Sequence, residues 1–390
     1  MLPHNVGIVG ISPPARMRRA RTRCGQTAAF ASAALCLCLF CLASLAALAR
    51  AAPASIDGIS DQSLPDWDGG FAGSYFAGLF RSQWIDTGHI RYARYVVQWN
   101  AMAPGHAGER AELEAWLGDV AGLGLTADVA LTSYDGVHPA SPGEYALRLA
   151  QLLAWARELG HTIPYLEAWN EPDNQGREPP AAAAGFANAA HTLCADFACA
   201  VIAGDFEDGP GLAAYERAYT RNLSFAPAIW GVHPYRSVQD MSEAPYLRFL
   251  RNLPREGAGA QVWITEIAAR RCTDYGGVAR SYGEAGQARR AAWLADTLLR
   301  NRSPANTFYY EFLLAGRRQP GCSAGEPEDD ALYEPAAPPS LLDRPRAAAR
   351  LIWVAGDVRQ TAEPAGEDER SGAESGVSAL DPQAPAMGAL

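Results

Sequence analysis

The sequence predicts an α/β fold in which eight strand–helix units close into a single (β/α)8 barrel, the TIM-barrel architecture. Short apolar, β-rich runs alternate with longer amphipathic stretches from about residue 60 to residue 355, and this alternation is typical of a parallel sheet built from βα units. Such a segment is long enough for eight units, which typically need ~250 residues. The rival is a doubly wound open sheet, which favours a Gly-rich phosphate turn after an early strand, and no such turn occurs in the sequence.

The elements follow from the apolar pattern in order along the chain. Seven strands are expected over 92–98, 126–131, 163–169, 200–203, 228–232, 261–265 and 307–312, and an early strand within 70–80 makes the eighth. Apolar residues recur at helical spacing over 112–123, 142–158 and 285–300. A last helix over 344–353 is expected to close the domain.

The N-terminal segment, residues 1–51, has the pattern of an export signal. A cluster of arginines, Arg16 to Arg23, precedes an almost wholly apolar stretch from Ala28 to Ala49. The tripeptide from Ala49 to Ala51 then offers an Ala-x-Ala cleavage site. A retained membrane anchor is the alternative, because an apolar stretch of this length can span a bilayer. We therefore expect a secreted protein or a membrane-anchored one with its domain outside the cell.

The charge of the chain bears on its partners. Six of the 33 basic residues, all of which are arginine, lie in residues 1–51, and all 43 acidic residues lie beyond that segment. The rest of the chain is therefore strongly acidic, which argues against nucleic acid or an anionic lipid surface as a partner. The tail over 356–390 is rich in Ala, Gly, Ser, Glu and Pro, and we expect it to be disordered. We expect a monomer.

Four cysteines lie beyond residue 51: Cys194, Cys199, Cys272 and Cys322. An even number in an exported chain suggests two disulfides, for which three connectivities are possible. We predict Cys194–Cys199, which are close in sequence, and Cys272–Cys322, which each lie in a loop after a late strand. Zinc is not expected, because no Cys-x-x-Cys or nearby pair of histidines accompanies these residues.

Two glutamates each end a buried strand. Glu171 follows the apolar run 163–168 within Trp169-Asn170-Glu171-Pro172, and Glu266 ends the run 262–265. If the strands are the fourth and seventh of eight, their ends face each other across the barrel mouth, where such folds carry their working residues. A pair of carboxyl groups about 5–5.5 Å apart suits retaining glycoside hydrolysis, and about 6.5–9.5 Å suits inversion.

These motifs resemble those of the large clan of TIM-barrel retaining glycoside hydrolases. Within that clan the resemblance is strongest to families 5 and 39. Trp169-Asn170-Glu171-Pro172 and Trp263-Ile264-Thr265-Glu266 carry the resemblance, which covers roughly residues 70–355. It implies that Glu171 is the general acid/base and Glu266 the nucleophile. It also implies no cofactor, no metal, and an oligosaccharide or polysaccharide as substrate.

Further positions match the clan. Asn170 would hydrogen-bond the sugar 2-hydroxyl, Tyr235 would orient the nucleophile, and His233 would support the site. Arg94 resembles the clan's second-strand arginine, and an arginine beside Glu266 would favour the ionised form that a nucleophile needs. Glu171 must instead keep its proton until it donates it.

The aromatic positions match less closely. Trp169 and Tyr310 are candidates for contacting the sugar. The clan usually places Trp on the eighth strand where this sequence has Phe308-Tyr309-Tyr310.

Several of these residues have a structural role as the alternative to a functional one. Glu167 shares the strand parity of Glu171, and we favour a structural pairing with an arginine such as Arg94. Arg94 is itself as well explained by an ion pair as by a site role. For His233 we favour a site role over core packing. A catalytically inactive barrel that binds polysaccharide is the alternative to an enzyme.

Overall fold

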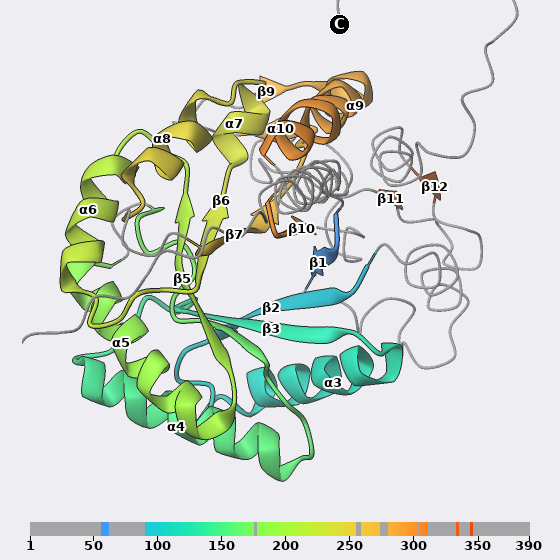
Figure 1. Cartoon of the computed structure of the whole chain (residues 1–390). Coiled ribbons are helices and arrows are strands. Elements are labelled where there is room, and N and C mark those ends of the chain that lie inside the picture. Colours follow the sequence, from blue (N-terminus) through green and yellow to red (C-terminus); the bar gives the residue numbers. More distant parts are fainter. Residues whose placement is uncertain are drawn as a thin grey trace, which may run out of the picture. The chain divides into compact units, whose positions relative to one another are not determined.

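A computed structural model describes residues 56–61, 90–174, 178–254, 259–273, 280–302 and 304–310, together with 333–334 and 344–345. The chain divides into two compact units, Met1–Pro53 and Ala54–Leu390, and all described residues belong to the second. Within that unit, eight parallel strands form a closed barrel in the order β1-β10-β7-β6-β5-β4-β3-β2 (Figure 1). The predicted (β/α)8 barrel is therefore confirmed.

The strands of the barrel are β1 (Gly58–Ser60), β2 (Tyr92–Gln98), β3 (Thr126–Thr132), β4 (Tyr165–Glu167), β5 (Ala200–Glu207), β6 (Ile229–His233), β7 (Gln261–Ile267) and β10 (Asn306–Tyr310). Seven of them lie where the apolar runs predicted them. The first does not, because β1 precedes the expected segment 70–80, which lies outside the described residues. β1 pairs with both β2 and β10 and so closes the barrel with only three residues.

The helices are α3 (Ala107–Leu123), α4 (Pro142–Glu158), α5 (Pro180–Phe197), α6 (Leu212–Asn222), α7 (Tyr235–Gln239), α8 (Ala244–Asn252), α9 (Gly283–Trp293) and α10 (Arg300–Arg302), with a π-helical segment, η5 (Leu294–Leu299), between the last two. Two short sheets pair β8 (Cys272–Thr273) with β9 (Arg280–Ser281) and β11 (Tyr333–Glu334) with β12 (Arg344–Pro345). The helix expected over 344–353 is therefore wrong at its start, where Pro345 lies in β12; the rest of that range lies outside the described residues.

Helix α4 begins where its local sequence dictates. Ser141 is the N-cap, and its Oγ accepts a hydrogen bond from the Glu144 amide at 3.2 Å. Glu144 Oε2 accepts in return from the Ala140 amide at 2.8 Å, and Pro142 occupies the first turn, where its missing N–H is not needed. These capping interactions and the proline fix the residue at which the helix starts.

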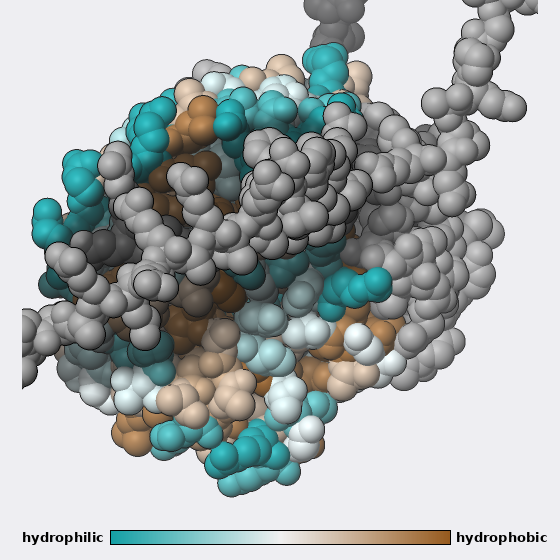
Figure 2. Space-filling model, viewed as in Figure 1, coloured by the Kyte–Doolittle hydropathy of each residue, from teal (hydrophilic) through white to brown (hydrophobic). Residues whose placement is uncertain are grey.

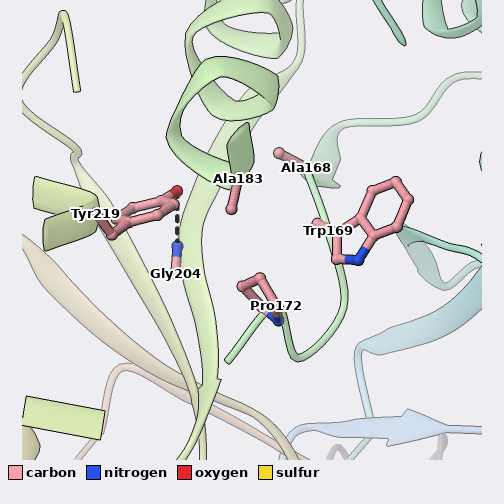
Figure 3. A pocket seen from close by; sticks show the side chains of 6 residues that line it. All are labelled: Ala168, Trp169, Pro172, Ala183, Gly204 and Tyr219. Carbon is pink, nitrogen blue, oxygen red and sulfur yellow. Dashed lines mark hydrogen bonds between the residues drawn. The ribbon is translucent and has the colours of Figure 1, made fainter. Parts of the chain in front are cut away.

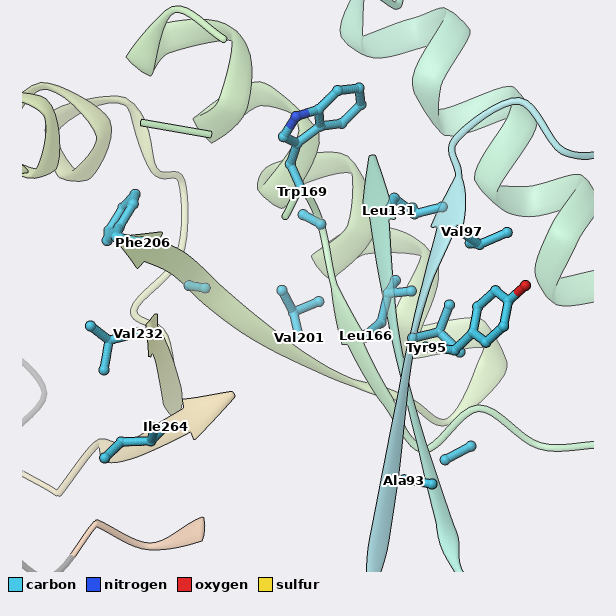
Figure 4. Packing of buried hydrophobic residues seen from close by; sticks show 14 of the residues in the cluster. Ala93, Tyr95, Val97, Leu131, Leu166, Trp169, Val201, Phe206, Val232 and Ile264 are labelled. Atoms are coloured by element: carbon cyan, nitrogen blue, oxygen red, sulfur yellow. The ribbon is translucent and has the colours of Figure 1, made fainter. Parts of the chain in front are cut away.

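Side chains that point outward from the strands form the main core against the helices. Figure 4 shows this layer, with Ala93, Tyr95 and Val97 of β2 beside Leu131 of β3. The intervening residues of β2 point into the barrel, as the two-residue period of a strand requires. On the face shown in Figure 2, hydrophilic residues lie along the outer helices and hydrophobic ones lie further in.

A second apolar cluster fills one end of the barrel interior and forms an aromatic floor. Its rings are Tyr92, Tyr165, Trp263 and Phe308, with Ile202 and Ile229 beside them. Neighbouring rings lie 4.6–6.0 Å apart between centroids, a range in which aromatic pairs attract. Because these residues precede the polar ones on the same strands, the floor lies toward the amino ends of the strands.

The cysteines are consistent with part of the prediction. Cys194 and Cys199 form a disulfide, which joins the end of α5 to the residue before β5. Cys272 is also disulfide-bonded, but its predicted partner Cys322 lies outside the described residues, as do the N-terminal segment and the acidic tail. No helix within the described ranges is long and apolar enough to cross a membrane.

Candidate active site

Arg94 of β2 lies at the centre of the polar layer above the floor. Its side chain is fully buried and forms a two-pronged ion pair with Glu167 of β4, through Nε to Oε1 at 2.9 Å and Nη2 to Oε2 at 2.7 Å. The same guanidinium donates from Nη1 to Ser60 Oγ at 3.0 Å. The predicted pairing of Glu167 with an arginine is confirmed, and Glu167 therefore has a structural partner.

The guanidinium also reaches the residues of the two motifs. Nη1 donates to Glu266 Oε2 at 2.6 Å, and Nη2 donates to Asn170 Oδ1 at 2.7 Å. Asn170 follows β4 and Glu266 lies in β7, so a single side chain ties together segments far apart in the sequence. Because Asn170 Oδ1 faces Arg94, the Nδ2 end of its amide is the one turned away from that contact.

The carboxylate of Glu266 is held at both oxygens. Oε2 takes the bond from Arg94, and Oε1 accepts from the Tyr235 hydroxyl at 2.6 Å. Tyr235 begins α7 directly after β6 and is buried, and the guanidinium carbon of Arg270 lies 3.9 Å from the centroid of its ring. The contact between Tyr235 and Glu266 is the one that the resemblance implied.

Glu171 lies just beyond β4 in an unusual backbone conformation. Its φ is +45°, in the left-handed region that a residue with a long side chain rarely adopts. Its carboxylate is held by His233 Nδ1 at 2.8 Å from Oε1 and by the Asn174 amide, which donates to Oε2 at 2.8 Å. These contacts turn the side chain toward β6, and strain of this kind concentrates at functional sites.

The two glutamates approach each other closely. One carboxylate oxygen of Glu171, one of Glu266 and a ring nitrogen of His233 all lie within 4.8 Å of one another. Both carboxylates are mostly buried, with side chains 12% and 11% exposed. Residues 95 positions apart in the sequence thus meet at the carboxyl ends of β4 and β7.

Burial and neighbouring charges shift the pKa values of the carboxyl groups in the polar layer, in opposite directions at different residues. Burial raises the pKa of Asp128 to about 6, although the neighbouring Glu167 carboxyl and Arg94 oppose this. Burial likewise raises the pKa of Glu167, again against Arg94. Asp205 behaves oppositely: burial would raise its pKa, but His233 and Arg94 together hold it well below the ordinary value.

Two groups of described residues bring three ligand atoms within 4.8 Å of one another, Glu167–Asp205–His233 and Glu171–His233–Glu266. Both depend on His233, whose two ring nitrogens each face a carboxylate oxygen at 2.8 Å. A metal ion would have to displace a proton from this histidine and hydrogen bonds from Arg94. The donor set is better matched to these internal cations, and we assign no metal site.

Trp169 does not lie among the polar residues, contrary to prediction. Its side chain is 2% exposed and packs in the outer core against Tyr145 and Phe186, with ring centroids 6.5 and 5.2 Å away. Apolar burial turns the indole toward the helices, so its predicted contact with a sugar is not supported. Tyr310, which is half-buried, pairs in register with Ser60, itself the partner of Arg94, and so lies at the level of the site.

A small apolar hollow lies behind the segment that carries Glu171. Its lining residues are Ala168, Trp169, Pro172, Ala183, Gly204 and Tyr219 (Figure 3). The Gly204 amide donates to the Tyr219 hydroxyl across one wall at 3.3 Å. The hollow has no room for a water molecule. Its lining residues therefore pack the segment after β4 in place, and we assign no ligand to it.

Asp205 of β5 was missed by sequence reasoning. It is buried and accepts a hydrogen bond from Arg94 Nη2 at 3.0 Å and one from Thr265 Oγ1 at 2.5 Å. The strand was expected to stop at Ala203, because Gly204 and Asp205 are residues that strands avoid. The signal that could have found it is a glycine inside an apolar run, which often marks a β-bulge.

Comparisons with known proteins bear on the fold. No family model matches the sequence, and no curated protein matches it. Among solved structures, the chain is similar to an endo-β-1,6-glucanase (11% identity, TM-score 0.51, 78% of this chain and 77% of that one). It is also similar to a fungal β-1,4-galactanase (14%, 0.50, 77% and 99%) and to an exo-β-1,4-mannosidase from Opitutaceae bacterium strain TAV5 (11%, 0.50, 80% and 60%).

The coverage of those relatives is uneven. The chain spans 60% of the mannosidase and 65% of a GH30 endoxylanase from Clostridium papyrosolvens C71. At such low identity the likeness establishes the fold, and these solved structures are (β/α)8 glycoside hydrolases. The chain shares the TIM-barrel fold of these enzymes.

Proposed function

We propose that this protein is an exported glycoside hydrolase that cleaves a β-glycosidic bond with retention of configuration. The observation that carries the proposal is the approach of Glu171 and Glu266, whose nearest carboxylate oxygens lie within 4.8 Å of each other at the barrel mouth. Retaining enzymes hold their two carboxyl groups about 5–5.5 Å apart, whereas inverting enzymes leave a wider gap for water. The N-terminal sequence pattern supports export.

In the first step, Glu266 attacks the anomeric carbon while Glu171 gives its proton to the departing glycosidic oxygen. The carboxylate of Glu266 is suited to attack because Arg94 and Tyr235 each fix one of its oxygens. A nucleophile held in one orientation needs less reorganisation to reach its transition state. The products of this step are a covalent glycosyl ester on Glu266 and the released alcohol.

In the second step, Glu171 takes a proton from water, and the resulting hydroxide displaces Glu266 from the sugar. Asn170 directly precedes Glu171, and its Oδ1 is bound to Arg94, which also holds Glu266. Its Nδ2 is then the donor available to a sugar hydroxyl next to the anomeric carbon. The substrate class is a β-linked oligosaccharide or polysaccharide.

The test is turnover of a panel of aryl β-glycosides and polysaccharides by the wild type, Glu171→Ala, Glu266→Ala and the exposed control Glu112→Gln. We expect Glu171→Ala to lower kcat by roughly 10²–10⁴-fold, the usual contribution of acid–base catalysis, and the control to match the wild type. Azide should rescue both alanine variants, giving the β-glycosyl azide with Glu171→Ala and the α-glycosyl azide with Glu266→Ala.

Proton NMR of the first product separates the parts of the proposal. Release of the β-anomer supports retention, and release of the α-anomer contradicts it while leaving the hydrolase intact. Equal background rates for all four proteins on every substrate would refute the proposal that the protein is an enzyme. Polysaccharide binding without turnover would favour the inactive binding barrel instead.

A further inference from the structure

Asp205 occupies a β-bulge that directs it into the barrel. The register between β5 and β6 shifts between Gly204 and Phe206, so Asp205 is an extra residue in its strand. Ala203 and Phe206 both pack in the outer core, as Figure 4 shows for Phe206, although a regular strand would put them on opposite faces. Asp205 has a φ of +57°, which aspartate tolerates better than most residues.

The neighbouring strands are shaped around this bulge. A Cβ added at Gly231 of β6 would lie 3.1 Å from Asp205 Oδ1 and 3.2 Å from its Cα. Gly204 has a φ of +93°, and a Cβ there would lie 2.8 Å from the ring of Phe206. Bulges next to active sites re-aim side chains, and here two glycines leave the room that the re-aimed aspartate needs.

The carboxylate of Asp205 is surrounded by donors from other strands. Thr265 of β7 and Arg94 of β2 each donate to it, at 2.5 and 3.0 Å, and His233 Nε2 of β6 lies 2.8 Å from Oδ1 as an ion pair. With this surrounding the pKa of Asp205, which burial would raise, is held well below its ordinary value by His233 and Arg94. A full negative charge therefore lies against the His233 ring.

His233 connects Asp205 to Glu171. Its Nδ1 lies 2.8 Å from Glu171 Oε1, so both ring nitrogens face carboxylate oxygens, the arrangement that suits a ring with hydrogen on both nitrogens. Burial would lower the pKa of His233, but the charges of Asp205 and Glu266 and the bonds to Asp205 and Glu171 raise it to about 10. Other titratable groups near His233 are Glu167, one of whose carboxylate oxygens lies within 4.8 Å of a ring nitrogen, Asp128, which interacts with it electrostatically, and Tyr235, whose ring lies 6.3 Å away between centroids.

We propose that Asp205 is a positioning residue that holds His233 as a doubly protonated cation, whose Nδ1–H in turn holds the Glu171 carboxyl facing Glu266. Asp205 acts through His233 and does not touch the sugar. This rests on the proposed function: Glu171 becomes a carboxylate when it has given up its proton, and a cation beside it stabilises that carboxylate until water arrives. Asn174 also donates to Glu171, at 2.8 Å, and Asp173 interacts with it electrostatically.

The first experiment follows the protonation of His233 directly and needs no turnover. In ¹⁵N NMR of the full chain, the His233 ring, identified by its loss in His233→Asn, should remain doubly protonated at pH 8. In Asp205→Asn, which keeps the shape and removes the charge, its titration should move down by roughly 1–3 pH units. The control Asp208→Asn changes another buried aspartate, bonded to Ser237 instead, and should leave the curve in place.

A neutral His233 at pH 7 in the wild type would overturn the proposal, even if Asp205→Asn failed to fold. An unchanged titration in a folded Asp205→Asn would overturn it too. Because this readout is independent of substrate, it stands apart from the fate of the hydrolase assignment.

The second experiment measures kcat and KM against pH on the best aryl glycoside. Asp205→Asn should lower kcat roughly 10-fold or more, because part of the acid–base contribution is lost, with little change in KM. The alkaline limb should move up by about one pH unit, since Glu171 keeps its proton longer beside a neutral ring. A purely structural role would lower stability or kcat without moving that limb, and this result would overturn the proposal.

Discussion

Arg94 carries more contacts than any simple ion pair requires. One guanidinium donates to Ser60, Glu167, Asn170, Asp205 and Glu266, which lie in or directly after four different strands of the barrel. The planar group of arginine offers five N–H donors in a fixed fork, whereas lysine offers a single ammonium on a flexible stem. The charge of Arg94 is therefore less important than its shape.

This argument predicts that Arg94→Lys is far from conservative. We expect it to lower the free energy of unfolding by roughly 3 kcal/mol, because buried carboxylates lose their partners, as measured by urea unfolding. Arg300→Lys is the matched control, because Arg300 pairs with Asp296 at the exposed end of η5. That change should stay within about 0.5 kcal/mol, and an equally small effect at Arg94 would contradict the argument.

At the residue scale, sequence reasoning succeeded where motifs set the spacing and failed where packing decides. The contacts of Glu266 with Arg94 and Tyr235 follow from matched positions. Trp169 was misplaced, because adjacency to a motif does not reveal on which side of a strand end an indole is buried. Asp205 was missed, because an aspartate after a glycine resembles a loop.

At the scale of elements, the boundaries of helices and strands were predictable where capping residues or prolines in the sequence mark them. Helix α4 spans the expected range 142–158, because Ser141 and Pro142 mark its start. Strand β5 instead runs four residues beyond the expected end, to Glu207. Its bulge is stabilised by β6, and such a partner cannot be read from the local pattern. The short β1 likewise owes its existence to pairing on both sides.

Replacing glycine by alanine should change the free energy of unfolding in opposite directions at the β5 bulge and in helix α3. Gly204→Ala should lower the free energy of unfolding by about 1–3 kcal/mol, because its φ is positive and its Cβ would meet Phe206. Gly118→Ala in α3, where a Cβ meets nothing within 4 Å, should raise it by about 0.4–1 kcal/mol. Thermal and urea unfolding of both variants measure this. A stabilised Gly204→Ala would show that the bulge is not required.

At the scale of the whole molecule, several buried groups hold protons longer than usual. Burial raises the pKa of Asp173 to about 8, with Glu171 and Glu207 adding to it, and raises that of Glu216 to about 8. His233, despite its burial, has a pKa of about 10 because of its carboxylate neighbours. In the range where these groups are protonated only in the folded state, unfolding releases protons, and rising pH therefore favours the unfolded chain.

The sign of this linkage predicts lower stability on the alkaline side. The contribution of His233 is fully present below pH ~6.5, its unfolded pKa, and is lost as the pH rises through about 10. Those of Asp173 and Glu216 are lost by about pH 8. Urea unfolding should therefore give a larger free energy at pH 6 than at pH 9. Glu216→Gln should reduce the difference, the exposed Glu112→Gln should preserve it, and equal stability at the two pH values would contradict the linkage.

The aromatic floor closes the barrel interior at the amino ends of its strands. Trp263, Phe308, Tyr92 and Tyr165 fill the amino ends of their strands, so a glycan can lie across the rim but cannot be threaded through the barrel. The two steps of the proposed reaction then follow a fixed order at the rim. The departing alcohol must leave the side next to Glu171 before water can reach that carboxylate.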